Sequence, residues 1–88
     1  MVEQTVTIQN RLGLHARACS VFVKAAARFA SHISIIRDGL EVNGKSILGV
    51  MMLAAEMGAN VVLRAEGKDE QEALEALVKV VNDKFGEE

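Results

Sequence analysis

Apolar residues along this chain switch between two spacings, and that switching constrains the fold more than any other feature. Where every second residue is apolar, a strand with one buried face is expected, and where apolar residues recur every three or four positions, an amphipathic helix is expected. Taken in chain order, the segments predict strands at about 2–8, 33–37, 40–42 and 61–66, and helices at about 16–27, 46–55 and 70–85. The predicted element order is therefore βαββαβα.

Elements that each bury one face pack as two layers. We therefore expect an α+β fold, an open-faced β-sandwich in which three helices cover one face of a four-stranded antiparallel sheet. Element order does not determine strand order, and a ferredoxin-like arrangement is equally compatible with it.

Turn and capping residues mark several element boundaries. Asp38-Gly39 is a two-residue turn of the kind that joins hairpin strands. Ser46 is a good N-cap for the second helix. Asp69, followed three residues later by Glu72, predicts a capping-box start for the third helix.

Length and composition predict one domain spanning residues 1–88, with a hydrophobic fraction of 50% that is sufficient for a packed core. One cysteine permits no internal disulfide, and no signal-peptide pattern follows Met1, so we expect a cytoplasmic location. Apolar runs are far shorter than the ~20 residues that span a membrane. The only aromatic residues are three phenylalanines that we assign to helical core stripes, which argues against nucleic-acid binding.

Charge is unevenly distributed. No acidic residue lies between Gln4 and Arg37, whereas eight of the twelve acidic residues lie from Glu66 onward. A basic N-terminal half predicts docking of an acidic or phosphorylated partner. The alternative is a solvated face whose charge is neutralised by the acidic third helix, and the sequence does not separate the two.

A histidine and an arginine stand where the first strand pattern gives way to the first helix pattern. His15 precedes that helix and Arg17 lies in its first turn, beside unpaired N–H groups and the positive end of the helix dipole. This combination suits phosphate binding, and a neutral imidazole can also carry a phosphoryl group covalently. Nearby positive charge disfavours the imidazolium form. The alternative is that His15 is a polar residue with no chemical role.

The segment 10–18, NRLGLHARA, resembles the active-site stretch of HPr, the family of histidine-containing phosphocarriers of the phosphoenolpyruvate-dependent sugar phosphotransferase system. The resemblance implies strand order 1-4-2-3 and phosphorylation of His15 on Nδ1. It further implies that the Arg17 side chain and the backbone N–H groups of Ala16 and Arg17 hold the phosphoryl group. Ala18 replaces the usual proline and Leu12 a frequent small polar residue, but neither change removes a reacting group.

The resemblance also implies a reversible mechanism and its partners. Phospho-enzyme I donates a phosphoryl group to His15, and a histidine of an enzyme IIA protein accepts it. The chain is then a carrier and not an enzyme, and we expect it to bind no cofactor, because phosphoenolpyruvate and Mg²⁺ belong to enzyme I. An exposed site that must meet two partners predicts a monomer. The alternative is a regulatory HPr-like protein, in nitrogen or catabolite control, that signals by its phosphorylation state without feeding sugar uptake.

The segment 43–51, NGKSILGVM, resembles the regulatory segment of HPr proteins from bacteria that have HPr kinase/phosphorylase. That resemblance implies ATP-dependent phosphorylation of Ser46, although helix capping is by itself a sufficient explanation for the serine.

The second helix carries more apolar residues than one buried face requires, which predicts a hydrophobic docking patch beside the basic site. The residues assigned to partner binding are Ile47, Leu48, Met51 and Lys24. The resemblance implies that this surface meets enzyme I and enzyme IIA. The alternative places Val50 and Met52 in the core and leaves the others singly exposed.

His15 and Cys19 are one helical turn apart, a spacing that permits a soft-metal site or an activated thiol. Only His32 adds another strong ligand, on a different element, so we expect no metal site and a buried, inert Cys19. His32 itself is expected at a surface or strand edge.

Overall fold

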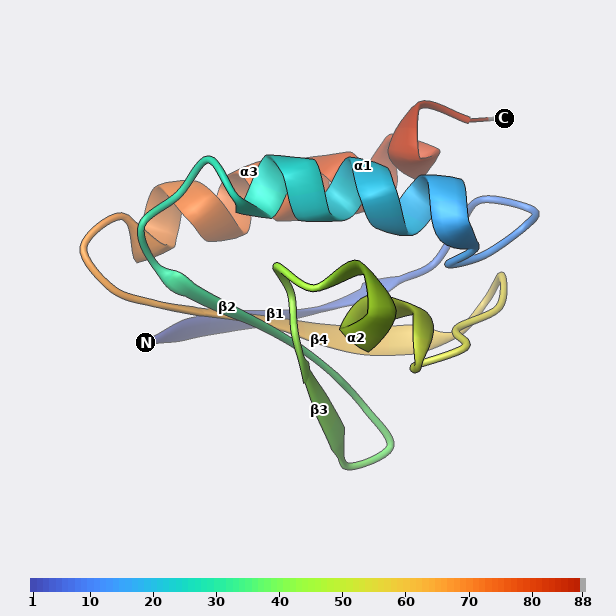
Figure 1. Ribbon diagram of the computed structural model, residues 1–88, viewed down its shortest axis with the longest axis horizontal. Helices are drawn as coiled ribbons and strands as arrows, with labels where there is room; N and C mark the ends of the chain where they lie inside the picture. The colour runs from blue at the N-terminus through green and yellow to red at the C-terminus, as the bar shows by residue number, and fades with distance from the viewer. Residues whose placement is uncertain (88) are drawn as a thin grey trace.

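The computed structural model describes residues 1–87 and has the element order that the sequence predicts (Figure 1). The strands are β1 (Val2–Thr7), β2 (His32–Arg37), β3 (Leu40–Asn43) and β4 (Asn60–Glu66), and the helices are α1 (Ala16–Ala26), α2 (Ile47–Met51), α3 (Glu70–Asn82) and the 3₁₀ turn η1 (Lys84–Gly86). The four strands form one antiparallel sheet in the order β1-β4-β2-β3. This confirms the order implied by the family resemblance and excludes the ferredoxin-like alternative.

Helices α1 and α3 lie side by side across one face of the sheet (Figure 1). The core lies between these layers, because the strands and both helices turn their apolar faces inward. In β4 the buried residues alternate with half-buried ones, as the period-two pattern predicts. The largest fully buried apolar side chains are Phe22, Ile8, Ile33, Ile35, Leu63 and Leu77. Each contributes about 1.5–3 kcal/mol by its removal from water.

The hairpin between β2 and β3 has the predicted tight turn. Asp38 has φ 49° and Gly39 has φ 83°, and two successive positive φ angles are typical of the type I′ turn that suits the twist of paired strands. Of the helices within residues 1–87, none combines the length and the apolar content that crossing a membrane requires.

Helix α2 is shorter than predicted. Ser46 is its N-cap, as expected, with Oγ accepting a hydrogen bond from the Gly49 N–H at 3.1 Å. The predicted end near Ala55 is wrong, because the helix ends at Met51 and Ala54 adopts the left-handed conformation with φ 48°. A left-handed residue cannot continue a right-handed helix.

The predicted capping box at the start of α3 is also wrong. The Asp69 carboxylate makes no capping bond, and instead accepts hydrogen bonds from the N–H groups of Ala30 and Ser31 and from the Ser31 hydroxyl. Asp69 therefore ties the loop after α1 to the start of α3. Those hydrogen bonds, the Ser31 hydroxyl first among them, lower the pKa of the carboxyl below its usual value.

The C-terminal end of α3 differs from its prediction in a way that matters for the site. The helix ends at Asn82, whereas the apolar stripe predicted a helix through Phe85. Phe85 lies in η1 with φ 55°, yet its side chain is buried. The chain turns at η1, and Glu87, which follows it, contacts His15 at the start of α1. The C-terminal segment lies on the side of the molecule where α1 begins (Figure 1).

Candidate functional site

The loop between β1 and α1 forms a tight turn that fits closely against the segment following α2. The Gly13 N–H donates to the Asn10 carbonyl at 3.1 Å, and Gly13 has φ +66°. A Cβ added at Gly13 lies 2.5 Å from the Ala55 carbonyl oxygen, so only glycine fits here. The next N–H, that of Leu14, donates to the same Ala55 oxygen at 2.8 Å. These contacts fix the backbone that leads into His15.

His15 is the N-cap residue of α1. Its backbone is extended, with φ −78° and ψ 176°, and its carbonyl accepts from the Cys19 N–H at 2.9 Å. The imidazole makes no capping bond, so the first N–H groups of α1, including those of Ala16 and Arg17, have no intrahelical acceptor. The His15 side chain is 30% exposed. It is therefore accessible at the positive end of a helix dipole.

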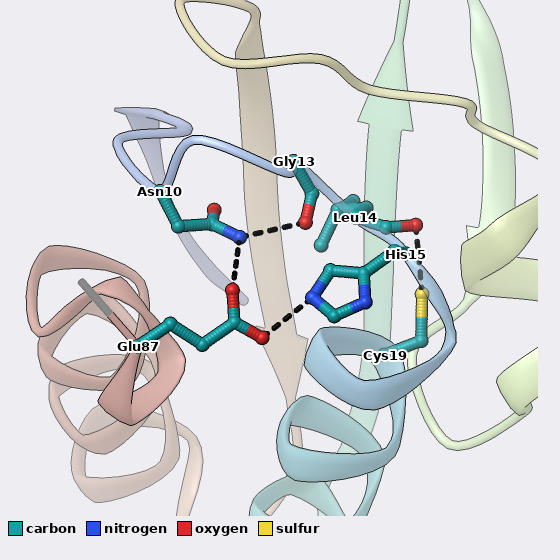
Figure 2. A network of polar contacts seen from close by, with 6 residues as sticks. All are labelled: Asn10, Gly13, Leu14, His15, Cys19 and Glu87. Carbon is teal, nitrogen blue, oxygen red and sulfur yellow. Dashed lines mark hydrogen bonds and ion pairs between the residues drawn. The ribbon is translucent and has the colours of Figure 1, made fainter.

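A glutamate from the C-terminal segment contacts the imidazole. Glu87 Oε2 lies 2.5 Å from His15 Nε2, and Glu87 Oε1 accepts a hydrogen bond from Asn10 Nδ2 at 3.0 Å. Asn10 Nδ2 also donates to the Gly13 carbonyl at 2.7 Å, so one amide group links the loop to the C-terminal segment. Figure 2 shows this network around the imidazole. The sequence analysis did not identify Asn10 or Glu87 as site residues.

This network determines which ring nitrogen is available. A hydrogen bond from Asn10 is the main cause that lowers the pKa of Glu87; burial opposes this effect, and smaller contributions from His15 and Arg17 lower the pKa further. Glu87 is thus ionised at neutral pH, and an ionised carboxylate only accepts hydrogen bonds. In the neutral ring, His15 Nε2 must then carry the proton, which leaves the lone pair on Nδ1.

Arg17 borders a surface hollow that also includes Glu87, the residue in contact with the imidazole. The hollow has a volume of about 310 Å³ and is lined by Arg11, Leu12, Arg17, Phe85, Gly86 and Glu87. Arg17 is exposed, and within residues 1–87 its guanidinium has no hydrogen-bonded or ion-paired acceptor. Its donors are therefore available to an anion near His15. Leu12, one of the two positions that depart from the HPr pattern, lies on the rim and is 67% exposed.

Cys19 is buried, as predicted. Its Sγ donates to the Leu14 carbonyl at 3.3 Å (Figure 2), and burial raises the pKa of the thiol to about 11. In the part of the chain that the structure describes, no three histidine, cysteine or carboxylate side chains gather as metal ligands. His32 is exposed at the start of β2, beyond the C-terminal end of α1, whereas His15 precedes that helix. Ala18, where a proline is usual, is fully buried in the first turn of α1.

Residues of α2 predicted for docking are exposed. Ile47 is 42%, Leu48 76% and Met51 39% exposed. Met52 is also exposed, which contradicts the alternative that placed it in the core, whereas Val50 is buried as that alternative expected. Lys24 lies on the exposed face of α1. The structure thus leaves these side chains accessible, and their role in docking stays a prediction.

Comparison with known proteins identifies the family. A family model described as the PTS HPr component phosphorylation site matches residues 2–83. The chain belongs to the HPr family. It is 47% identical over 87 residues to the phosphocarrier protein HPr of Cupriavidus necator, and the aligned residues cover 99% of this chain and 98% of that relative. HPr proteins are phosphocarriers of the bacterial phosphotransferase system, so a carrier is the general function that family membership supports.

One further relative and two solved structures are also similar to this chain. The HPr-like protein Crh of Bacillus subtilis is 47% identical over 83 residues, which cover 94% of this chain and 98% of Crh. A crystal structure of HPr from Thermoanaerobacter tengcongensis matches with a TM-score of 0.96 at 49% identity, covering 100% of this chain and 99% of that one. Another structure from that organism is an HPr dimer, with a TM-score of 0.79 at 48% identity over 99% of this chain and 100% of that one. The expected monomer therefore stays a prediction.

Proposed function

We propose that this HPr-family protein carries a phosphoryl group on Nδ1 of His15, accepting it from phospho-enzyme I and passing it to enzyme IIA proteins of the sugar phosphotransferase system. The contact between Glu87 and His15 Nε2 is the observation that carries this proposal. The contact keeps the proton on Nε2, so the lone pair that can act as the nucleophile is on Nδ1.

Each transfer step is a substitution at phosphorus. The lone pair of His15 Nδ1 attacks the phosphoryl group of the donor phosphohistidine, the N–P bond of the donor breaks, and Nε2 keeps its proton. Phosphohistidine then bears a dianionic group, and the Nε2–H bond to Glu87 persists because that carboxylate remains an acceptor. Transfer to enzyme IIA runs the same step in the opposite direction, with His15 as the leaving group.

The start of α1 supplies the stabilisation that the dianion needs. The N–H groups of Ala16 and Arg17 and the helix dipole favour a negative group by about 0.3–1 kcal/mol, and the exposed Arg17 guanidinium adds charge-assisted hydrogen bonds. These contributions are modest, which suits a carrier because tight binding would trap the phosphoryl group. We propose that the chain works as one domain, in the cytoplasm and as a monomer, without a cofactor and without turning over a substrate alone.

The carrier proposal is tested by the intact mass of the protein after incubation with phosphoenolpyruvate, Mg²⁺ and purified enzyme I. The wild type is expected to gain one acid-labile phosphoryl group, and His15→Ala none. A wild type that gains nothing from an enzyme I active on another HPr contradicts the proposal. A gain that persists in His15→Ala contradicts the assignment of the site.

We further propose docking of both partners on the exposed apolar face of α2, next to the basic α1. The surface consists of Ile47, Leu48, Met51 and Lys24. Leu48→Asp is expected to raise the KM of enzyme I for this protein as phosphoryl acceptor, because it places a charge on the docking surface. Little stability should be lost, since the Leu48 side chain is 76% exposed. An unchanged KM contradicts this part of the proposal.

Ser46 is proposed as a regulatory site for HPr kinase/phosphorylase. Its hydroxyl already caps α2, and a phosphate at a helix N-terminus stabilises that helix. Inhibition must then come from negative charge on the docking surface. Ser46→Asp is expected to leave the fold stable and to slow phosphorylation of His15, and a strongly destabilised Ser46→Asp protein contradicts this account.

A second function is favoured by the identity of 47% to Crh. In it, the phosphorylation state of His15 or Ser46 is a regulatory signal, in nitrogen or catabolite control, and the phosphoryl group is not passed on to sugar uptake. Adding an enzyme IIA protein to phosphorylated protein separates the two: loss of phosphate from His15 to enzyme IIA supports the carrier, and retention supports the regulator.

A further inference from the structure

Arg37, at the end of β2, holds the loop that follows α2. Its Nη1 donates to the carbonyls of Leu53 and Ala54 at 3.1 and 3.0 Å, and its Nη2 lies 2.7 Å from Glu56 Oε1. The Arg37 side chain is only 22% exposed, so this planar group is packed in place and is not a freely solvated surface charge. The guanidinium thereby ties the segment 53–56 to the sheet.

The loop needs such support. Ala54 has φ 48°, a left-handed conformation that is unfavourable for residues with a Cβ. The carbonyls of Leu53 and Ala54 lie beyond the last turn of α2, where a helix no longer supplies N–H donors. A strained conformation persists only where surrounding contacts hold it. Arg37 provides two of those contacts at the strained residue and the one before it.

The same loop, residues 53–56, contacts the backbone that directly precedes His15. The Ala55 carbonyl accepts the Leu14 N–H at 2.8 Å, and Gly13 approaches it so closely that a Cβ has no room. Leu14 directly precedes His15. A displacement of Ala55 therefore moves the residue that sets the position of the imidazole. The contacts run without a gap from Arg37 through the loop to His15.

We propose that Arg37 is a positioning residue for phosphoryl transfer: it fixes the loop after α2, and the loop fixes the backbone that presents His15 Nδ1. Arg37 does not itself touch His15 in this arrangement. The inference rests on the carrier function proposed above. It accounts for a half-buried arginine with several hydrogen bonds that the transfer chemistry does not use directly.

The first arm of the test uses hydrogen exchange, which needs no enzyme. Arg37→Ala is compared with Arg64→Ala, a matched control because Arg64 is 32% exposed and pairs with Glu3 and Glu41 across the sheet. We expect the Leu14 amide to exchange about tenfold faster in Arg37→Ala than in the wild type, because local opening of the loop exposes this amide. The acceleration is measured relative to any change at the Leu63 amide in the centre of β4, which reports global unfolding. Arg64→Ala should leave Leu14 as in the wild type. Equal Leu14 protection in wild type and Arg37→Ala overturns the proposal.

The second arm measures phosphorylation of His15 at saturating phospho-enzyme I, so that docking does not limit the rate. We expect Arg37→Ala to be slower by about fivefold or more, since small misplacements of a reacting group are costly. Arg37→Lys should recover part of the rate because an ammonium still reaches carbonyls, and Glu56→Gln should change it little because the carbonyl contacts remain.

Outcomes of the two arms are distinguishable. Rapid Leu14 exchange with an unchanged transfer rate overturns the positioning role and leaves the carrier function intact. If the wild type itself is not phosphorylated, the carrier function fails, and the exchange arm still decides whether Arg37 holds the loop.

Discussion

Replacement of Gly13 by alanine tests the close fit between the His15 loop and the segment after α2. The left-handed backbone at φ +66° destabilises the folded state of the alanine variant by about 1–2 kcal/mol. The lower conformational entropy of its unfolded chain offsets about 0.4–1 kcal/mol of this loss. The new Cβ lies 2.5 Å from the Ala55 oxygen and 2.9 Å from the Glu56 Cα, both backbone atoms that cannot rotate away. Forcing an atom into such a contact costs about 1–3 kcal/mol. The expected loss in the free energy of unfolding is therefore about 1–5 kcal/mol.

Gly39→Ala is the matched control. Gly39 has φ +83°, and a Cβ at this position would have no heavy atom within 4 Å, so only the net conformational cost applies, about 0–1.6 kcal/mol. Urea unfolding followed by far-ultraviolet circular dichroism measures both, since the chain has no tryptophan or tyrosine. We also expect Gly13→Ala, and not Gly39→Ala, to slow phosphorylation of His15. Equal stability losses in the two variants would refute the close contact with Ala55.

Three further predictions follow from the polar contacts. Because the folded-state pKa of Asp69 lies below its ordinary value of 3.8, its ionised carboxylate stabilises the fold above pH 3.8, and this stabilisation is lost as the pH falls through the folded-state pKa. Asp69→Asn should therefore flatten the acid limb of a stability–pH profile. An unchanged acid limb contradicts this assignment. Glu87→Gln should slow phosphorylation of His15 by about two- to tenfold, because an amide holds the Nε2 proton less strongly than a carboxylate, whereas an equal rate shows that the carboxylate is dispensable. The thiol of Cys19, with a pKa of about 11, should resist iodoacetamide at pH 8 in the folded protein and react in urea, and rapid labelling of the native state contradicts its burial.

Local signals were sufficient to predict the order of the elements and to place His15 and Arg17 at the start of α1. The alternation in β4 and the stripe on α3 each depend on residues close in the chain, so periodicity identified them. The same holds for His15 and Arg17, because a histidine before a helix is visible in the sequence itself. The strand order required the family resemblance, since pairing of β1 with β4 is not encoded in the element order.

Long-range contacts account for what the sequence analysis missed. Asn10 and Glu87 are 77 positions apart, and they meet through the turn at η1, where Lys84 and Phe85 both have positive φ, after α3. Asp69 was assigned to a helix cap by its spacing to Glu72, but tertiary donors on the loop after α1 compete for the carboxylate. In each case the deciding partner lies on another element, and neither spacing nor composition reports it.

The central claim is that His15 accepts the phosphoryl group on Nδ1 while Glu87 holds the proton on Nε2. Long-range ¹H–¹⁵N correlation spectra of ¹⁵N-labelled protein, recorded before and after phosphorylation by enzyme I, assign each ring nitrogen directly. We predict that phosphorus is bonded to Nδ1 and that Nε2 is protonated in both states. Phosphorus on Nε2, or an unmodified His15 in a protein that has gained a phosphoryl group, would contradict the account.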